Sequence, residues 1–272
     1  MPILFSDVTV VPMDGAPQVL EHAYVAVEGT KIASVGTEPP EGTFDRVVDG
    51  AGKVLLPGFV NAHTHLPMTL MRGYGGGCDL HTWLNQYIFP AEARLDSRAV
   101  AAGAGLGLAE MIASGVTCVA DMYMHTGTIA EQILEAGISA NLSCGGVYFG
   151  APEDFSPETC GDCRNQAALT EEWHGAGAGQ ILVDASVHGE YTSNPPLWRW
   201  MAEYAAEHRL GMHVHVSETQ SEHQASLERW GKTPIQALDG CGVWDCGRSL
   251  AAHCVYTTEE DWALMAEKGI SC

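Results

Sequence analysis

Two histidines stand one residue apart in the segment PGFVNAHTHLP, residues 57–67, at the end of an apolar run. If this run is a β-strand, His63 and His65 project from the same face, because side chains alternate along a strand. Two neutral imidazoles on one face can both reach a divalent ion at about 2.0–2.1 Å. A valine or isoleucine would be buried at lower cost in a core strand, so the pair predicts a metal site.

The same spacing recurs at His213 and His215, in the segment GMHVHVSETQSEH. If His215 is a third ligand at the end of a strand, Glu218 falls in the loop just above the metal, where a general acid or base is needed. His213 then lies one layer deeper, in a supporting or packing role. His253 ends a later apolar run and could reach a metal-bound water.

Two regions that differ in their rhythm must position these residues. Residues 1–56 alternate short β-rich pieces with Gly, Pro and Asp turns, which predicts hairpins of a small antiparallel sheet, the N-terminal part of a small β-sandwich domain. Residues 57–272 alternate strand-like runs with longer helical stretches. This pattern predicts an α/β fold, a parallel (β/α)8 barrel of the TIM type. Helices are expected near residues 97–114, 127–137, 165–178, 195–208, 219–230 and 258–268.

A barrel of this kind places its chemistry at the carboxyl ends of its strands, where His63, His65, His215 and His253 fall. Eight strand–helix units need roughly 250 residues or more. Fewer residues than that follow the N-terminal region. We therefore expect about the first six units and the start of a seventh strand, with the C-terminal part of the barrel missing.

Composition excludes several classes of function. Apolar residues make up 46% of the chain, and 13 basic against 34 acidic residues give a net charge of −21. So few basic residues argue against a nucleic-acid or anionic-membrane partner. No run reaches the ~18 apolar residues of a membrane helix, and the N-terminus lacks the features of a signal peptide. We expect a cytoplasmic protein whose nine cysteines are reduced thiols.

Four segments together resemble the amidohydrolase superfamily. They are PGFVNAHTHLPMTLMRGYG, WLNQYIFPAEARL, MHVHVSETQSEH and LAAHCVY. The sequence is most similar to the branch that contains the 5′-methylthioadenosine/S-adenosylhomocysteine and 5′-deoxyadenosine deaminases, and the resemblance runs over essentially the whole chain. It implies a zinc-dependent hydrolase that replaces the amino group of an adenosine-type nucleoside, leaving an inosine-type product and ammonia.

The resemblance also implies roles for individual residues. One divalent metal, most often zinc, would be bound by three histidines, and a glutamate would shuttle the proton to the purine ring. A fourth histidine would hydrogen-bond the metal-bound hydroxide, and three further residues would contact the ribose, the substrate and its 5′ substituent. The metal ligands would be His63, His65 and His215, the proton shuttle Glu218, and the histidine beside the hydroxide His253. Glu92 would contact the ribose, His188 the substrate and Arg164 its 5′ substituent.

The family comparison bears on the metal count as well. Members with two metals bridge them through a carboxylated lysine at the end of the fourth barrel strand. None of the four lysines here lies near residues 181–191, where His188 stands instead, so one metal is expected. The family's fourth ligand, an Asp at the end of the eighth strand, is absent from the chain. If these residues were the whole polypeptide, we would expect weak metal affinity and little activity.

Two alternatives remain open at this point. One is an aminohydrolase or chlorohydrolase that acts on another heterocycle, such as guanine, cytosine or a triazine. The other is a truncated, inactive barrel that serves as a ligand-binding or interaction module. In either enzymatic case the partner is a small molecule, and the resemblance implies a homo-oligomer for the full-length protein.

Overall fold

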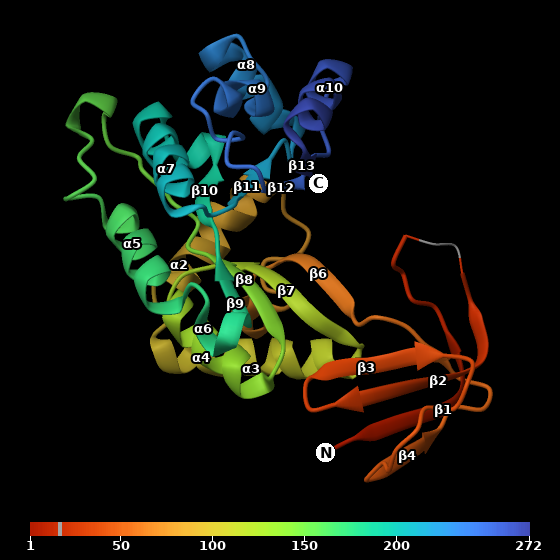
Figure 1. Cartoon of the computed structure of the whole chain (residues 1–272). Helices are drawn as coiled ribbons and strands as arrows, with labels where there is room; N and C mark the ends of the chain where they lie inside the picture. Colours follow the sequence, from red (N-terminus) through yellow and green to blue (C-terminus); the bar gives the residue numbers. More distant parts are fainter. Residues whose placement is uncertain (16–17) are drawn as a thin grey trace. The chain divides into compact units, whose positions relative to one another are not determined.

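The computed structural model describes residues 1–15 and 18–272. The chain folds into two compact units, Met1–Phe59 and Val60–Cys272 (Figure 1). The sequence predicts a domain boundary after residue 56, and the compact units divide a few residues later. In the described part of the chain, no helix is long and apolar enough to cross a membrane.

Within the described residues, the first unit is a five-stranded sheet with the order β3-β2-β1-β4, and β5 also pairs with β1. The pairs β1–β2 and β2–β3 are antiparallel, as expected of hairpins. The expectation of a purely antiparallel sheet is wrong for β4 and β5, which run parallel to β1. Residues 37–45 are a connection long enough to carry the chain past β2 and β1 to the far edge. The strands are β1 (Ile3–Val10), β2 (Leu20–Glu28), β3 (Lys31–Gly36), β4 (Arg46–Asp49) and β5 (Val54–Leu55).

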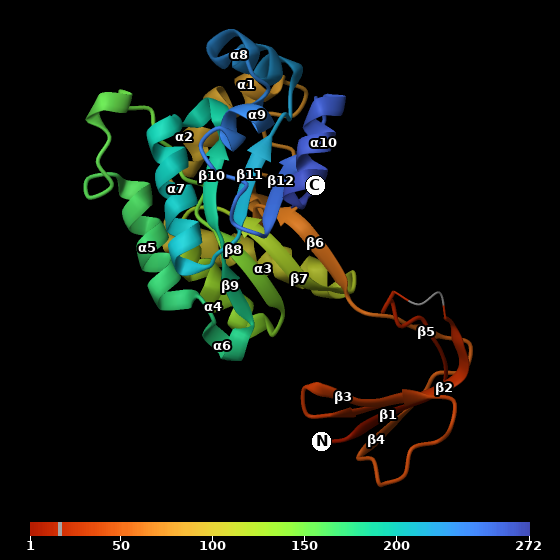
Figure 2. The same cartoon turned by 45° about the horizontal axis from the view of Figure 1, so that its top comes forward.

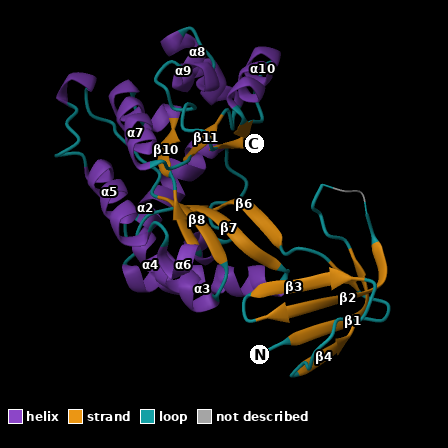
Figure 3. Cartoon of the chain, viewed as in Figure 1, coloured by secondary structure: helices purple, strands orange, loops and turns teal. Residues whose placement is uncertain are grey.

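The second unit is built on parallel strands in two linked four-stranded sheets, in the orders β6-β7-β8-β9 and β10-β11-β12-β13 (Figures 2 and 3). The strands β9 and β10 are two halves of one strand, interrupted at Asp184. They give the predicted (β/α) barrel, with six units and the start of a seventh strand. The bounds are β6 (Phe59–Thr64), β7 (Val116–Met122), β8 (Ser139–Ser143), β9 (Ile181–Val183), β10 (Ala185–Gly189), β11 (Met212–Val216), β12 (Ser249–His253) and β13 (Ile270–Ser271).

The interruption at Asp184 is held by hydrogen bonds at the amino-terminal ends of the strands. Its buried carboxylate accepts a hydrogen bond from the Gly211 N–H at 2.9 Å and another from the Arg248 guanidinium at 2.5 Å. One carboxylate therefore connects the strand to the turns that precede β11 and β12, far from the carboxyl ends where the histidines lie.

Helices cover the outer face of the strands, and most lie where the sequence predicts them. The prediction of one helix over 165–178 is wrong at both ends, because the helix begins at Gly161 and stops before Gly175, whose φ is 84°. Glycine takes this left-handed conformation without steric cost. The helices are α3 (Ser97–Ala113), α4 (Thr126–Ala136), α5 (Gly161–Trp173), α6 (Ala176–Gly179), α7 (Pro195–His208), α8 (Gln220–Trp230), α9 (Pro234–Asp239) and α10 (Glu259–Lys268).

Apolar side chains of these helices and strands form two buried clusters. In β11 all five residues are buried, with Val214 on the outer side against α7 and the histidines on the inner side. The larger cluster includes Val187, Leu197, Trp198, Met201, Val214 and Trp244, and the other includes Val119, Ile129, Ile133 and Leu142. The rigid layer outside the barrel thus fixes the strand ends that carry the site.

A long connection after β6 forms short helical turns that the sequence does not predict. It includes one turn of π-helix, a geometry often found at functional sites. Shorter turns also follow β8 and β10. These elements are η1 (Leu66–Met71), α1 (Leu80–Thr82), η2 (Trp83–Ile88), α2 (Phe89–Glu92), η3 (Pro152–Asp154) and η4 (Glu190–Thr192).

Candidate metal centre and adjoining pocket

Within the described residues, imidazoles gather at the carboxyl ends of four strands, the first barrel strand β6 and the three adjacent strands β10, β11 and β12. β6 carries one and is followed by a second, β11 carries two, and β10 and β12 carry one each. Alternation along each strand turns these side chains toward the inside of the barrel. In chain order they are His63, His65, His188, His213, His215 and His253.

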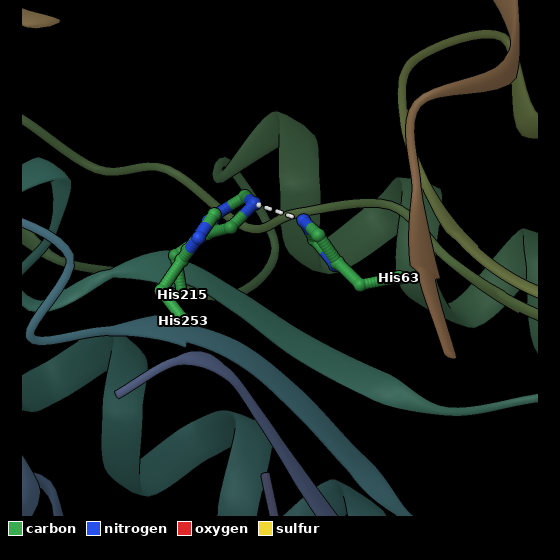
Figure 4. Close-up of side chains that lie close together, drawn as sticks. All are labelled: His63, His215 and His253. Atoms are coloured by element: carbon green, nitrogen blue, oxygen red, sulfur yellow. Dashed lines mark hydrogen bonds between the residues drawn. The ribbon is translucent and has the colours of Figure 1, made fainter. Parts of the chain in front are cut away.

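Three of these rings approach one another through their Nε2 atoms. His215 Nε2 lies 3.2 Å from His63 Nε2 and 3.3 Å from His65 Nε2. Two nitrogens bound to one tetrahedral zinc ion at about 2.0–2.1 Å are about 3.3 Å apart, so both distances fit joint ligation. Figure 4 shows His63 facing His215 and His253 from the opposite side, and one ring nitrogen of each lies within 4.8 Å of the others.

In His65 and His215, the hydrogen bond made by Nδ1 shows which ring nitrogen carries the lone pair. His65 Nδ1 donates to the carbonyl oxygen of Met122 at 2.5 Å, and His215 Nδ1 donates to the carbonyl oxygen of His188 at 2.6 Å. A neutral imidazole has one N–H, so both Nε2 atoms carry lone pairs. Two lone pairs that face each other at 3.3 Å cannot hydrogen-bond, and a shared cation satisfies both.

Burial keeps the imidazoles neutral, which is the form that binds a metal. Burial, with smaller contributions from neighbouring imidazoles, lowers the pKa of His63 to about 3 and that of His188 to about 4. Burial also lowers the pKa of His65, although its hydrogen bond to a backbone carbonyl raises it in part. Burial likewise lowers the pKa of His215 well below its usual range.

His253 lies in the cluster but differs from the other rings in its surroundings. Its ring stacks on His215 with centroids 5.4 Å apart, and its Nε2 lies 3.7 Å from Glu218 Oε2. Histidines that bind metals generally donate their other N–H to an acceptor, and His65 and His215 each have such an acceptor. The geometry therefore places His253 beside the three converging rings and close to Glu218.

The loop after β11 holds Glu218 next to His253. Burial raises the pKa of Glu218, and the neighbouring His253 lowers it in part. The loop is anchored by Glu222 in the first turn of α8, which forms a capping box with Thr219. Glu218 is therefore a carboxyl group that keeps its proton more readily than an exposed glutamate.

A pocket of about 370 Å³ opens beside the histidines. His65 and His188 form part of its wall, and the connection after β6 supplies much of the rest. Its lining combines aromatic and sulfur-containing side chains with two carboxylates, which suits a small, flat ligand with a few polar groups. Other lining residues are Met68, Trp83, Leu84, Ile88, Phe89, Glu92, Met122, Tyr123, Met124, Cys144, Gly145, Val147, Phe149, Asp162 and Thr192.

The predicted ribose-binding residue, Glu92, lies in this pocket at the end of α2. Only 8% of it is exposed, and burial raises its pKa. The hydroxyl of Tyr123, the residue that follows β7, lies close enough to lower the pKa of Glu92 in part. Burial raises the pKa of Tyr123, and the neighbouring Glu92 raises it further. The pair puts a carboxyl acceptor among the mainly apolar side chains of this wall.

The other two predicted substrate contacts differ. His188 lines the pocket, and its Nδ1 lies 3.0 Å from Thr192 Oγ1. Arg164 does not line the pocket, because its guanidinium donates to the carbonyl oxygen of Glu158 at 2.7 Å. In its place, Asp162 from the same helical turn reaches the pocket wall.

Several residues of the site had no distinct signal in the sequence. Tyr123 and Asp162 belong to the pocket because of the way two loops fold back, which residue spacing does not reveal. Glu222 could have been found, since a Thr followed three residues later by Glu before a helix is the pattern of a capping box.

A parallel barrel with converging, neutral histidines beside a small pocket defines a class of proteins with a metal centre at the strand ends. The chain belongs to the amidohydrolase family, whose pattern matches residues 54–272. The family and the histidine cluster together support a bound divalent metal.

Among curated relatives, the chain is 36% identical over 266 residues to a 5-methylthioadenosine/S-adenosylhomocysteine deaminase of Syntrophomonas wolfei, a match that covers 97% of this chain and 60% of the relative. It is 39% identical over 251 residues to a 5′-deoxyadenosine deaminase of Methanothermobacter thermautotrophicus, covering 92% and 58%. The chain thus spans about 60% of the length of these relatives.

Among solved structures, a zinc-bound adenosine deaminase from Xanthomonas campestris is 29% identical with a TM-score of 0.87, and the match covers 98% of this chain and 61% of that one. A zinc complex of atrazine chlorohydrolase from Arthrobacter aurescens has the same TM-score at 22% identity, covering 99% and 64%. At that identity the second likeness shows the fold alone.

Proposed function

We propose that the protein deaminates an adenosine-type nucleoside by metal-dependent hydrolysis, with residues 57–272 forming the metal-binding barrel and residues 1–56 part of a small β-sandwich. The substrates considered are 5′-methylthioadenosine, S-adenosylhomocysteine, 5′-deoxyadenosine and adenosine. The observation that carries the proposal is the convergence of three neutral imidazoles beside a pocket that contains a buried glutamate. The printed names of the curated relatives support the same substrate class.

In this proposal His63, His65 and His215 would hold one zinc ion. Their Nε2 distances fit tetrahedral ligation, and two of the rings have a backbone carbonyl that fixes the second nitrogen. The absence of a lysine from β9 and β10, where His188 stands, supports a single ion. When bound, zinc would supply a Lewis acid that activates water at neutral pH.

Glu218 would act as the proton carrier. Its pKa is raised by burial, so it can hold a proton and release it to a ring nitrogen of the purine, which makes the amino-bearing carbon more electrophilic. It can then take up the proton of the attacking water and pass it to the departing amino group, which leaves as ammonia. His253, 3.7 Å from Glu218, would orient the water by a hydrogen bond.

Glu92 and His188 would hold the nucleoside in the pocket. A buried carboxylate that accepts hydrogen bonds from two sugar hydroxyls distinguishes a ribose-bearing ligand from a free base. The apolar wall of Met68, Trp83 and Phe89 would cover the substrate and exclude bulk water. Arg164 is left out of this site, because its guanidinium already donates to the carbonyl oxygen of Glu158 in the loop that precedes α5.

The test is an ammonia-release assay with metal analysis of the same sample. The substrates are the four nucleosides above, with guanine and cytosine as the alternative heterocycles. Release of ammonia from a nucleoside by the zinc-containing protein, and not from guanine or cytosine, supports the proposal. Turnover of none of the nucleosides by a zinc-loaded, full-length protein contradicts it.

A substitution at the proton carrier separates chemistry from binding. Glu218→Gln keeps the shape of the side chain and removes the proton that it transfers. We expect zinc to stay bound and kcat to fall by at least about a hundredfold, the lower range for a general acid–base. Full activity in this variant would remove Glu218 from the mechanism.

A further inference from the structure

His213 is a buried imidazole that the proposed reaction does not use. It lies in β11 two residues before His215, so both rings point to the same inner face of the strand. None of its surface is exposed. An imidazole is costly to bury unless both ring nitrogens have partners, so its contacts carry information.

Both ring nitrogens of His213 have such partners, on two other strands. Its Nε2 lies 2.9 Å from Nδ1 of His63 in β6, and its Nδ1 lies 3.2 Å from Oγ of Ser143 in β8. The Ser143 hydroxyl in turn donates to the carbonyl oxygen of Asp121 in β7 at 3.3 Å. Ser143 and Asp121 are also fully buried. A chain of hydrogen bonds thus crosses the inside of the barrel, from His63 to a backbone carbonyl.

A bound cation fixes the direction of every bond in this chain. If Nε2 of His63 ligates the metal, its only N–H is on Nδ1, and that group must donate to Nε2 of His213. The N–H of His213 is then on Nδ1 and donates to Ser143, whose hydroxyl donates to Asp121. Each donor has an acceptor in this arrangement, and no proton is added or lost.

The opposite direction would interfere with metal binding. If Nε2 of His213 carried the proton, it would donate to Nδ1 of His63. The N–H of His63 would then lie on Nε2, facing His215 at 3.2 Å and occupying the position of the metal. His213 cannot itself ligate the ion in either arrangement, because its Nε2 is engaged by His63.

We propose that His213, supported by Ser143, is a positioning residue for the metal centre, which holds His63 in the ring orientation and tautomer that present its Nε2 lone pair to a divalent ion. His63 differs here from His65 and His215, whose Nδ1 atoms are held by backbone carbonyls. A side chain that supports a ligand can be removed by substitution, and comparable partners change metal affinity by about 10–100-fold. This inference rests on the proposed metal centre.

The test measures how fast the zinc-loaded full chain loses zinc to a chromogenic chelator, and at what chelator concentration. His213→Leu removes the acceptor and keeps an apolar residue of similar size in the core. His213→Gln restores an amide oxygen near the position of Nε2. We expect the affinity for zinc to fall about 10–100-fold in the leucine variant and to stay within about threefold of wild type in the glutamine variant.

Two serine variants refine the test. Ser143→Ala removes the last side chain of the network, so we expect a smaller loss of zinc affinity, and no additional loss when it is combined with His213→Leu. Ser186→Ala is the matched control, since Ser186 is an equally buried serine in β10 whose hydroxyl contacts Gly145 and Cys144 and no histidine. It should retain zinc as wild type does.

The outcomes separate this inference from the proposed reaction, because no substrate is present. Equal zinc affinity in wild type and His213→Leu, with circular dichroism showing an intact fold, would overturn it. An equal loss in the glutamine and leucine variants would also overturn it, since the acceptor would then not be what matters. A wild-type chain that retains no zinc would overturn the metal centre and this inference together. Zinc retention without ammonia release would overturn only the proposed reaction.

Discussion

The carboxylate of Glu222 accepts a hydrogen bond from the backbone N–H of Glu218 at 2.7 Å and another from the N–H of Ser217 at 2.8 Å. The same side chain closes the capping box that begins α8. Ser217 lies two residues after His215 and directly before Glu218. It is buried and has a φ of 51°, which is unusual for a residue other than glycine. Glu222 thus holds a strained loop that carries the proposed proton carrier.

Replacing Glu222 by alanine should therefore affect both stability and catalysis. Loss of the capping interaction should lower the free energy of unfolding by about 0.5–2 kcal/mol. We expect kcat to fall about tenfold in addition, since Glu218 would no longer be held beside His253. Urea unfolding and steady-state kinetics on zinc-loaded protein measure the two effects.

A second capping box provides the control for this prediction. Gln236 has the same place in α9 that Glu222 has in α8, and it pairs with Thr233. Gln236→Ala should lower stability without changing kcat. If Glu222→Ala also left kcat unchanged, the loop would not depend on Glu222 for its catalytic geometry.

The sequence predicted the parts of the site that follow from regular structure. Alternation in a strand placed His63 beside His65, and the helix that begins after Thr219 followed from its pattern. The strand ends of a parallel barrel meet at one edge, so two histidines separated by 150 residues came together as expected. Local periodicity and one topological rule were sufficient for these.

The remainder of the site depends on contacts that local sequence does not encode. The connection between residues 66 and 92 has no apolar periodicity, yet its short turns build a large part of the pocket wall. The acceptors of His65 and His215 are backbone carbonyls, which every residue possesses, so no residue type identifies them. Arg164 illustrates the converse, because a matching residue type did not ensure that the side chain reaches the pocket.

Asp121 gives a prediction of pH dependence. It is fully buried in β7, its Oδ1 accepts from the Leu66 N–H at 2.6 Å, and burial raises its pKa to about 7. From about pH 4, the value of an unfolded aspartate, up to about pH 7 the unfolded chain releases a proton that the native protein keeps. Stability should therefore fall as pH rises through this window, by up to about 1.4 kcal/mol per pH unit.

Asp121→Asn isolates this effect, because the amide retains an oxygen for the Leu66 N–H and cannot ionise. Urea unfolding of the metal-free proteins should show the variant gaining stability relative to wild type between about pH 5 and about pH 7, and a constant difference above that. A difference that does not change with pH would show that Asp121 is ionised in the native protein throughout this range.

Glu92 should distinguish nucleosides from free bases. A hydrogen bond to a charged group contributes about 1.5–3 kcal/mol, so Glu92→Gln should lower kcat/KM for a nucleoside about 10–100-fold. Adenine lacks the sugar hydroxyls and should react equally well, if slowly, with both proteins. An equal loss for adenine and for the nucleoside would mean that Glu92 supports the pocket rather than the sugar.

The charge of the pocket should select among 5′ substituents. Two carboxylates, Glu92 and Asp162, belong to the described lining, and none of those lining residues is a lysine or arginine. An anionic group in such an apolar space meets like charges without a partner, at a cost of several kcal/mol. We expect kcat/KM for 5′-methylthioadenosine or 5′-deoxyadenosine to exceed that for adenosine 5′-monophosphate at least about a hundredfold.

Two variants show which side chain sets this preference. Asp162→Asn removes one negative charge from the wall. It should lower the ratio of kcat/KM for 5′-methylthioadenosine to kcat/KM for adenosine 5′-monophosphate by about tenfold, because the phosphate then meets one carboxylate fewer. Arg164→Ala should leave this ratio unchanged, since the Arg164 guanidinium donates to Glu158 outside the pocket.

The informative comparison for Arg164 is S-adenosylhomocysteine, whose amino acid group carries both a positive and a negative charge. If Arg164→Ala lowered kcat/KM for S-adenosylhomocysteine selectively, the arginine would have to move from Glu158 into the pocket when that substrate binds. Arg164 would then contact the 5′ substituent, as the family resemblance implies.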